Sequence, residues 1–320
     1  MTFKRLAFLF ALLATPAFAQ DYPARPVTLI VPFAPGGSTD VIARVVAQGM
    51  RAELGQTVVV ENHAGAGGSL GTGMIARAAP DGYTIGMATA STVAINPAAY
   101  RNLPFDVLKD LAPITNIAAV PNIMSVHPSV AAKTMAEFIA LAKAQPGKLA
   151  YGSSGNGSVS HLMGEQFKLA TGTDIVHVPY RGIGPAMNDA IGGMIQVLYD
   201  NLPTSLPHVQ AGKLRALAVS GEKRVAALPD VPTFTELGLK DLEWMAFFGL
   251  VAPANTPPAV ITKLNAAAVK VIATPEVRRA LELQQAIPVG NSPAQFRAEI
   301  ERDLARMKRA VEAANIRVDN

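Results

Sequence analysis

Short apolar runs alternate with amphipathic stretches along most of the chain, which predicts alternating strands and helices. Residues 27–33 (VTLIVPF) form a nearly continuous apolar run, as expected for a strand buried on both faces. A helix is expected next, capped by Ser38 or Thr39 and ended at Gly55, because apolar residues then recur at helical spacing. This alternation predicts the α/β class with mostly parallel sheets. Further strands are expected at residues 57–61, 83–88, 148–152, 174–178, 195–199 and 214–219.

Several later helices are marked by their first residues. Thr134 and Glu137 form a capping box. Proline is expected at the first helical position directly after Thr256, Thr274 and Ser292. The last of these helices carries one apolar face, formed by Phe296, Ile300, Leu304, Met307 and Val311.

A glycine- and serine-rich turn follows a strand in each half of the chain. The strand VTLIVPF leads into APGGSTD and a helix, and the strand KLAYG leads into SSGNGSVS and a helix. Open α/β sheets bind ligands at the carboxyl ends of their strands, so two such turns predict a cleft between two domains. The apolar stretches near residues 111–126 and 244–253 are expected to be strands that cross between the domains. The first domain then combines residues 22–121 with 244–320, and the second spans residues 122–243.

Both turns carry groups that bind an anion. A helix N-terminus presents free backbone N–H groups and the positive end of its dipole. In the first turn Gly36 and Gly37 let a ligand approach the backbone, and Ser38 and Thr39 add hydroxyls. The second turn, residues 153–158, holds three serines, two glycines and an asparagine. Helix capping explains any one of these serines, whereas the two turns together favour ligand binding.

Two further positions have both a structural and a ligand-binding interpretation. Ser91 and Thr92 follow the strand predicted at residues 83–88, and they either reach the same cleft or form a polar turn. Asp200 ends the strand predicted at residues 195–199. Its carboxylate either points into the cleft or, together with Asn201, caps the next helix. The sequence leaves both choices open.

The first 19 residues have the features of a secretory signal peptide in the correct order. Lys4 and Arg5 provide a basic start, residues 6–13 are apolar, and residues 17–19 (AFA) form a cleavage site. The apolar segment is too short to span a bilayer, and the alternative is a short buried helix. We therefore expect a soluble protein exported to the periplasm, without a lipid anchor because the sequence contains no cysteine.

Composition narrows the classes of function. The chain has 320 residues, of which 50% are hydrophobic, and a net charge of +4, so it is not a disordered protein. The absence of cysteine excludes thiolate zinc sites, iron–sulfur clusters, disulfides and cysteine nucleophiles. Lysine and arginine form no cluster of five or more, so nucleic acid is not an expected partner.

The sequence also lacks the motifs of common enzyme classes. It contains no P-loop and no complete dinucleotide fingerprint, and the residues GSSG at 152–155 do not form a nucleophile elbow. The five histidines show no metal-binding spacing. We therefore expect no catalytic residues, no metal and no cofactor.

Read together, these segments resemble the Bug-type extracytoplasmic solute receptors of tripartite tricarboxylate transporters. The resemblance begins with YPARPVTLIVPFAPGGSTDVIAR at residues 22–44 and includes ENHAGAGGSLGT, PDGYTIGM, YGSSGNGSVSHL, VHVPYRGIGPAMNDAIGG and YDNLPTSLPHVQAGKLRALAVSG. It extends over essentially the whole chain after the signal peptide. The one departure noted is Tyr199, where the family motif more often has phenylalanine. The resemblance implies a two-domain periplasmic binding fold, a Venus flytrap, with two crossover segments.

The resemblance also implies a site and a function. It implies that a small carboxylate in the interdomain cleft is held by backbone and hydroxyl groups, and that the protein delivers this ligand to transmembrane permease subunits. We expect a monomer that closes on its ligand by a hinge motion and performs no chemistry. The alternatives are an exported enzyme acting on small carboxylic acids and a sensor subunit for a signalling partner. The ligand-binding positions carried over from the family are Pro35, Gly36, Gly37, Ser38, Thr39, Asp40, Ser91, Thr92, Ser153, Ser154, Gly155, Asn156, Gly157, Ser158 and Asp200.

Overall fold

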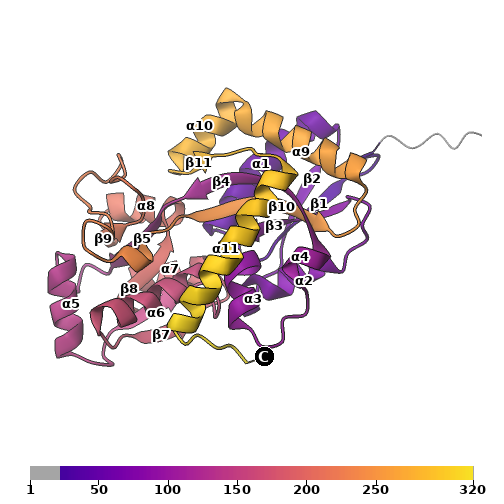
Figure 1. The fold of residues 1–320 in the computed structure, drawn as a ribbon. Helices are drawn as coiled ribbons and strands as arrows, with labels where there is room; N and C mark the ends of the chain where they lie inside the picture. Colours follow the sequence, from indigo (N-terminus) through magenta and orange to yellow (C-terminus); the bar gives the residue numbers. More distant parts are fainter. Residues whose placement is uncertain (1–21, 320) are drawn as a thin grey trace, which may run out of the picture.

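The computed structural model describes residues 22–319, which form two β-sheets covered by helices (Figure 1). The signal peptide predicted at residues 1–19 lies outside the described residues. The division into two sheets with helices packed against them confirms the predicted α/β fold class.

The first sheet has six strands in the order β11-β4-β10-β3-β1-β2. Strand β1 pairs in parallel with β2 and β3, whereas β10 runs antiparallel to both β3 and β4, and β11 runs antiparallel to β4. The bounds are β1 Val27–Val31, β2 Val58–Asn62, β3 Thr84–Thr89, β4 Leu111–Val120, β10 Ala246–Pro253 and β11 Ile287–Pro288.

The second sheet has five strands in the order β7-β6-β8-β5-β9. Strand β6 pairs in parallel with β7 and β8, whereas β5 runs antiparallel to β8 and β9. The bounds are β5 Asn122–Val126, β6 Ala150–Ser153, β7 Val176–Pro179, β8 Val197–Asn201 and β9 Arg215–Val219.

Both sheets are mixed, so the prediction of mostly parallel sheets is wrong. The antiparallel pairs all involve β4, β5 or β10. Parallel pairing requires a crossover connection that returns the chain to the same end of the sheet. Strands β5 and β10 instead enter directly from the other sheet, so they run opposite to the parallel strands beside them, and β11 runs in the same direction as β10.

Two extended segments connect the sheets, as expected from the apolar stretches near residues 111–126 and 244–253. Strands β4 and β5 follow one another with only Pro121 between them, and each belongs to a different sheet. The return segment enters the first sheet as β10. The Asn122 side chain donates a hydrogen bond of 2.7 Å to the carbonyl oxygen of Trp244, so the two crossings are bonded to each other.

Most helices begin where the sequence indicates. The Thr134–Glu137 capping box is present, and the proline after Thr274 and after Ser292 opens its helix. The helix after Thr256 begins one residue later, at Pro258. The larger helices are α1 Ser38–Leu54, α2 Ser69–Ala76, α5 Met135–Ala144, α6 Val159–Thr171, α7 Ile183–Ile191, α8 Leu202–Gln210, α9 Pro258–Ala273, α10 Pro275–Leu283 and α11 Pro293–Ala313; short turns are η1 Ala66–Gly68, η2 Ser91–Ile95, α3 Asn96–Ala99, α4 Val107–Asp110 and η3 Lys240–Leu242.

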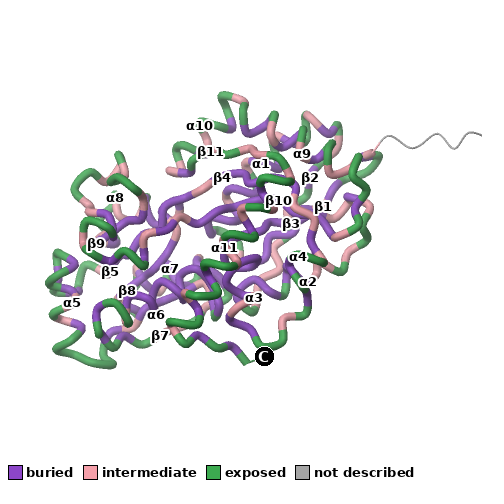
Figure 2. Tube along the Cα trace, in the orientation of Figure 1, coloured by how far each residue is buried: buried purple, intermediate pink, exposed green. Residues whose placement is uncertain are grey.

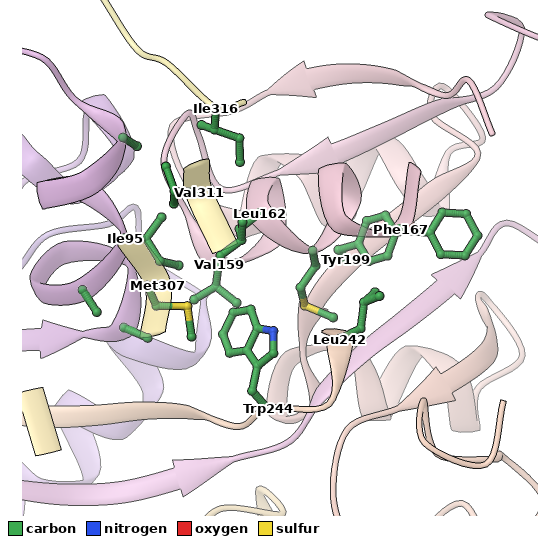
Figure 3. Close-up of a cluster of buried hydrophobic side chains, with 14 of the residues drawn as sticks. Ile95, Val159, Leu162, Phe167, Tyr199, Leu242, Trp244, Met307, Val311 and Ile316 are labelled. Atoms are coloured by element: carbon green, nitrogen blue, oxygen red, sulfur yellow. The ribbon is translucent and has the colours of Figure 1, made fainter. Parts of the chain in front are cut away.

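Buried residues concentrate on the strands and on the inner faces of the helices (Figure 2). One hydrophobic cluster extends from the first sheet into the second, and α11 crosses the front of the molecule over this region (Figure 1). In this cluster Trp244 lies beside Val159 of α6 and Met307 of α11 (Figure 3). Among the described residues, no helix is both long and apolar enough to cross a membrane.

Candidate ligand-binding site

A small cavity of about 40 Å³, partly open to solvent, lies between the two sheets. The carboxyl ends of β1, β3, β6 and β8 all contribute to it, which agrees with the general position of ligand sites in α/β sheets. Its lining residues are Phe33, Gly37, Ser38, Thr39, Thr89, Ala90, Ser91, Ser154, Val159, Ser160, Ile183, Asp200, Asn201, Ala246, Phe247 and Phe248.

The N-terminus of α1 faces this cavity. Its N-cap is Gly37, and among the described residues no side chain caps the helix, so the expected capping by Ser38 or Thr39 is wrong. Both residues lie inside the first turn, where the backbone N–H groups have no intrahelical acceptor. The uncapped turn therefore presents N–H donors and the positive end of the helix dipole to the cavity.

Asp40 shapes this loop from outside the cavity. Its carboxylate accepts hydrogen bonds from the Gly36 amide (3.1 Å), the Arg44 guanidinium (3.0 Å) and the Asn62 side chain (3.0 Å). Burial acts to raise its pKa, but these hydrogen bonds outweigh burial and hold the pKa of Asp40 below the ordinary value. Asp40 is thus a charged anchor of the first turn and is not among the lining residues.

Ser91 and Thr92 have different surroundings. Ser91 begins a turn of π-helix and lines the cavity, and its Oγ accepts a hydrogen bond of 2.9 Å from the Val159 amide of α6. Its hydroxyl proton is therefore left to donate elsewhere. Thr92 is buried behind it, where its hydroxyl accepts from the Thr89 amide at 3.0 Å.

Only Ser154 of the second turn, residues 153–158, lines the cavity. Its amide donates to the hydroxyl of Ser160 at 2.9 Å, and Ser160 also lines the cavity, although the sequence analysis did not select it. Ser158 caps α6 by accepting from the His161 amide. Ser153, Gly155, Asn156 and Gly157 shape the turn, and Gly155 and Asn156 line a separate hollow beside Tyr100.

Asp200 lies in the cavity wall, as one of the two interpretations expects, whereas among the described residues no side chain caps α8, so the capping interpretation is wrong. Asp200 lines the cavity and is 3% exposed, and it accepts hydrogen bonds from the Asn201 amide and from the hydroxyls of Thr204 and Ser205 at the start of α8. Burial raises its pKa to about 6, even though these hydrogen bonds favour the charged form. A carboxyl that titrates near neutral pH therefore lies in the cavity wall.

Hydrogen bonds join the two sheets around the cavity. The hydroxyls of Ser38 and Thr204 lie 3.2 Å apart, and the Tyr100 hydroxyl donates to the Asn156 carbonyl oxygen at 3.0 Å. Pro35 and Gly36 lie at a second hollow with Gly184 of α7 on the opposite wall. The polar residues on the two sides are thus in direct contact.

The apolar wall of the cavity was missed by the sequence analysis. Phe247 and Phe248 belong to β10, and Phe33, Val159 and Ile183 complete this wall. Such residues are indistinguishable from core residues in a sequence, because nothing local marks the face that meets a ligand. The Tyr199 hydroxyl, the one departure from the family motif, lies buried away from the cavity and has no hydrogen-bond partner among the described residues.

The lining residues limit the chemistry of the site. In the part of the chain that the structure describes, Asp200 is their one ionisable side chain, and the other polar groups are hydroxyls, amides and backbone. Within residues 22–319 no cluster of three or more His, Cys, Asp or Glu side chains is placed to hold a metal ion. The site is equipped to bind through hydrogen bonds and apolar contact.

Comparison with known proteins gives a consistent result. Protein BugT of Bordetella pertussis is 40% identical over 295 residues, which cover 92% of this chain and 90% of BugT. The periplasmic binding protein BugD superposes with a TM-score of 0.90 at 34% identity, covering 93% of this chain and all of BugD.

Two further solved structures are equally extensive matches and contain ligands. The R. palustris protein Rpa4515 with adipate is 36% identical, with a TM-score of 0.90 and coverage of 94% of this chain and 100% of its own. MatC from Rhodopseudomonas palustris with bound malate is 31% identical, with a TM-score of 0.88 and coverage of 91% and 100%. The model of the tripartite tricarboxylate transporter family receptor matches residues 42–316. The chain therefore belongs to the tripartite tricarboxylate transporter receptor family.

Proposed function

We propose that this protein is a periplasmic receptor that binds a small carboxylate in the cavity between the two sheets and delivers it to a membrane permease. The observation that carries the proposal is the uncapped N-terminus of α1, which faces a cavity lined with hydroxyl groups. The bound adipate and malate of the two R. palustris relatives support a carboxylate as the ligand class.

The carboxylate is bound by N–H groups of the first turn of α1 and by hydroxyl groups from both sides. From the positions selected in the sequence, the direct contacts are Gly37, Ser38, Thr39, Ser91, Ser154 and Asp200, and Ser160 is added to them. The remaining positions, such as Asp40 and Ser158, hold the turns in shape. The phenylalanines of β10 contact the apolar part of the ligand.

The two sheets correspond to two domains, one formed by residues 22–121 and 244–320 and the other by residues 122–243. The hydrogen bonds between Ser38 and Thr204, Ser91 and Val159, and Tyr100 and Asn156 belong to a closed arrangement. Opening at the crossing segments breaks these bonds and admits the ligand. A ligand that contacts both domains stabilises the closed arrangement through those added contacts.

Export through the predicted signal peptide places the receptor in the periplasm as a monomer, where it meets the transmembrane permease subunits implied by its family. The protein performs no reaction on its ligand. The family match and the adipate- and malate-bound relatives support a binding role.

A ligand screen tests this proposal. Thermal unfolding is measured with adipate, malate, citrate, glutamate and benzoate, with adipamide as a matched control that has the chain of adipate without its charges. A ligand present at 100 times its dissociation constant stabilises the folded protein by about 2.7 kcal/mol. We expect at least one carboxylate and not adipamide to raise the melting temperature.

Calorimetry and scattering then complete the test. We expect a single site by calorimetry, a more compact particle by small-angle scattering with ligand, and unchanged ligand after hours of incubation. Stabilisation by adipamide alone contradicts the carboxylate site. Consumption of the ligand contradicts the receptor, and identical scattering with and without a tightly bound ligand contradicts the domain closure.

A further inference from the structure

Two histidines stack face to face directly behind the second turn. His161 lies in the first turn of α6 and His177 on β7, with ring centroids 4.1 Å apart and ring planes inclined by 10°. Neither ring lines the cavity. Each ring forms a hydrogen bond to a different end of residues 153–158, so the pair contacts the turn from outside the cavity.

The His161 ring holds the end of the turn. Its Nδ1 accepts a hydrogen bond of 3.1 Å from the Gly157 amide. An amide can only donate, so this nitrogen carries no proton and the proton of the neutral ring is on Nε2. Gly157 has a φ of +72°, a conformation that favours glycine, so the bond fixes a residue with few conformational restraints of its own.

The His177 ring holds the start of the turn. Its Nε2 lies 2.6 Å from the hydroxyl oxygen of Ser153. The same oxygen accepts from the Gly155 amide at 3.1 Å and lies 3.4 Å from the Gly155 carbonyl oxygen, so Ser153 links the ring to Gly155 whichever of Nε2 and Oγ donates. The His161 ring therefore accepts from one end of the turn, and the His177 ring shares a short hydrogen bond with the other end.

The stack is anchored in the core of the second sheet. His177 also stacks on Tyr151 of β6, with centroids 4.9 Å apart. The Tyr151 hydroxyl donates to Glu165 at 2.7 Å, and Glu165 pairs with Lys168 at 3.0 Å, both on α6. This connected group ties β6, β7 and α6 together behind the turn.

Both rings remain neutral over the working range of pH. Burial, with the proximity of Lys168, lowers the pKa of His161 to about 4, and burial together with the proximity of His161 lowers the pKa of His177 to about 3. The remaining charged or titratable groups around the stack are Glu165 and the phenols of Tyr151 and Tyr199. Nδ1 of His161 is therefore available as an acceptor at neutral pH.

We propose that the His161–His177 stack is a positioning element that sets the conformation of residues 153–158 and thereby places the Ser154 and Ser160 hydroxyls in the cavity. The turn holds two glycines with positive φ and has little apolar side chain with which to fix itself. Its two ends are held by rings that are in contact with each other. The effect on ligand binding rests on the proposed function, whereas the effect on the turn does not.

A pair of substitutions at position 161 tests the proposal. In His161→Asn the amide oxygen occupies the place of Nδ1 and still accepts from the Gly157 amide, whereas His161→Leu has similar bulk and no acceptor. Hydrogen exchange of the Gly157 amide is measured by NMR in the protein without ligand. We expect exchange at least tenfold faster in the leucine variant and within threefold of wild type in the asparagine variant. Affinity for adipate, measured by calorimetry, is expected to fall at least tenfold in the leucine variant only.

A second variant distinguishes loss of the contact that positions the turn from a general loss of protein stability. Phe138→Leu perturbs a fully buried ring on α5 that contacts Phe167 and makes no hydrogen bond to the turn. We expect it to lower the melting temperature without accelerating exchange at Gly157. The proposal is overturned if the Gly157 amide exchanges equally fast in wild type and in His161→Leu. It is also overturned if exchange in His161→Asn is as fast as in His161→Leu.

A measurement on the wild-type protein keeps the test decisive if the leucine variant does not fold. Imidazole ¹⁵N chemical shifts report the tautomer of each ring, and we expect Nε2–H for His161. The Nδ1–H tautomer of His161 overturns the proposal. If exchange at Gly157 behaves as expected but no carboxylate binds the wild-type protein, the positioning role holds and the proposed ligand class fails.

Discussion

Substitution of Gly67 by alanine tests domain closure without touching the cavity. Gly67 belongs to η1 on the first sheet and has a φ of +58°. A Cβ atom at this position overlaps the carbonyl oxygen of Asn156 in the second turn and lies 3.3 Å from the Tyr100 hydroxyl. Gly67 is not a lining residue, so a change in affinity comes through its contact with the second turn, either by opposing closure or by shifting Ser154, and the compaction measured by scattering distinguishes the two.

The magnitude follows from comparing the closed and open arrangements. A carbon atom and a backbone oxygen cannot overlap, so the turn has to move away and the Tyr100–Asn156 hydrogen bond is lost, which costs about 0.5–1.5 kcal/mol. Residual crowding adds to this cost. The strain of alanine at positive φ, about 1–2 kcal/mol, is present in both arrangements and cancels in binding. Closure is disfavoured by about 0.5–1.5 kcal/mol plus the cost of the crowding, which weakens the apparent affinity about two- to tenfold or more.

Gly55→Ala provides the matched control. Gly55 also has a positive φ, +68°, but no atom lies within 4 Å of its Cβ position. Both variants are expected to lose about 1–2 kcal/mol of stability in urea unfolding, and only Gly67→Ala is expected to lose affinity by calorimetry and compaction by scattering. Equal affinities in the two variants would refute the argument that the contact of Gly67 and Tyr100 with Asn156 forms when the domains close on the ligand.

Three further predictions concern buried polar groups. Tyr199→Phe is expected to raise the free energy of unfolding by about 1 kcal/mol, because it removes a buried hydroxyl without a partner; loss of stability in urea unfolding contradicts this. Carboxylate affinity is expected to rise about tenfold from pH 7 to pH 5, because the Asp200 carboxyl, with its pKa raised to about 6, becomes neutral and no longer repels the ligand. Asp200→Asn should abolish this rise in calorimetry, and a rise that persists in the variant shows that Asp200 is not its cause. Because the pKa values of His161 and His177 are lowered on folding, the free energy of unfolding is highest above about pH 6.5 and falls by about 2 kcal/mol per histidine at pH 5, partly offset by the raised pKa of Asp200. His161→Asn should remove one histidine's share of this fall, as measured by urea unfolding at pH 7 and pH 5, and an unchanged pH dependence in the variant contradicts the prediction.

Local features of the sequence determined the elements and the turns between them. The apolar run VTLIVPF, the Thr134–Glu137 capping box and the proline after Ser292 each act through residues within one helical turn or along one strand. Such signals are readable because the groups that satisfy each other are neighbours in the chain. The two glycine- and serine-rich turns were found in the same way, and both lie at the cavity.

Tertiary contacts decided which residues of those turns face the cavity. Ser154 lines it, whereas Ser153 turns back to His177, a residue 24 positions away on another strand. Ser91 is oriented by the Val159 amide from the second sheet. The direction of a serine in a glycine-rich turn depends on such distant partners, so spacing along the chain does not reveal it.

The sequence also left the directions of the linking strands and the apolar wall undetermined. Whether β10 runs with or against its neighbours depends on the end from which it enters the first sheet, and that is fixed by the path of the chain through the second. Phe247 and Phe248 are adjacent on this strand and both line the cavity. Apolar periodicity separates buried from exposed positions. It does not separate apolar residues that contact a ligand from those that pack against other side chains, because both kinds of surface are shielded from water and have the same composition.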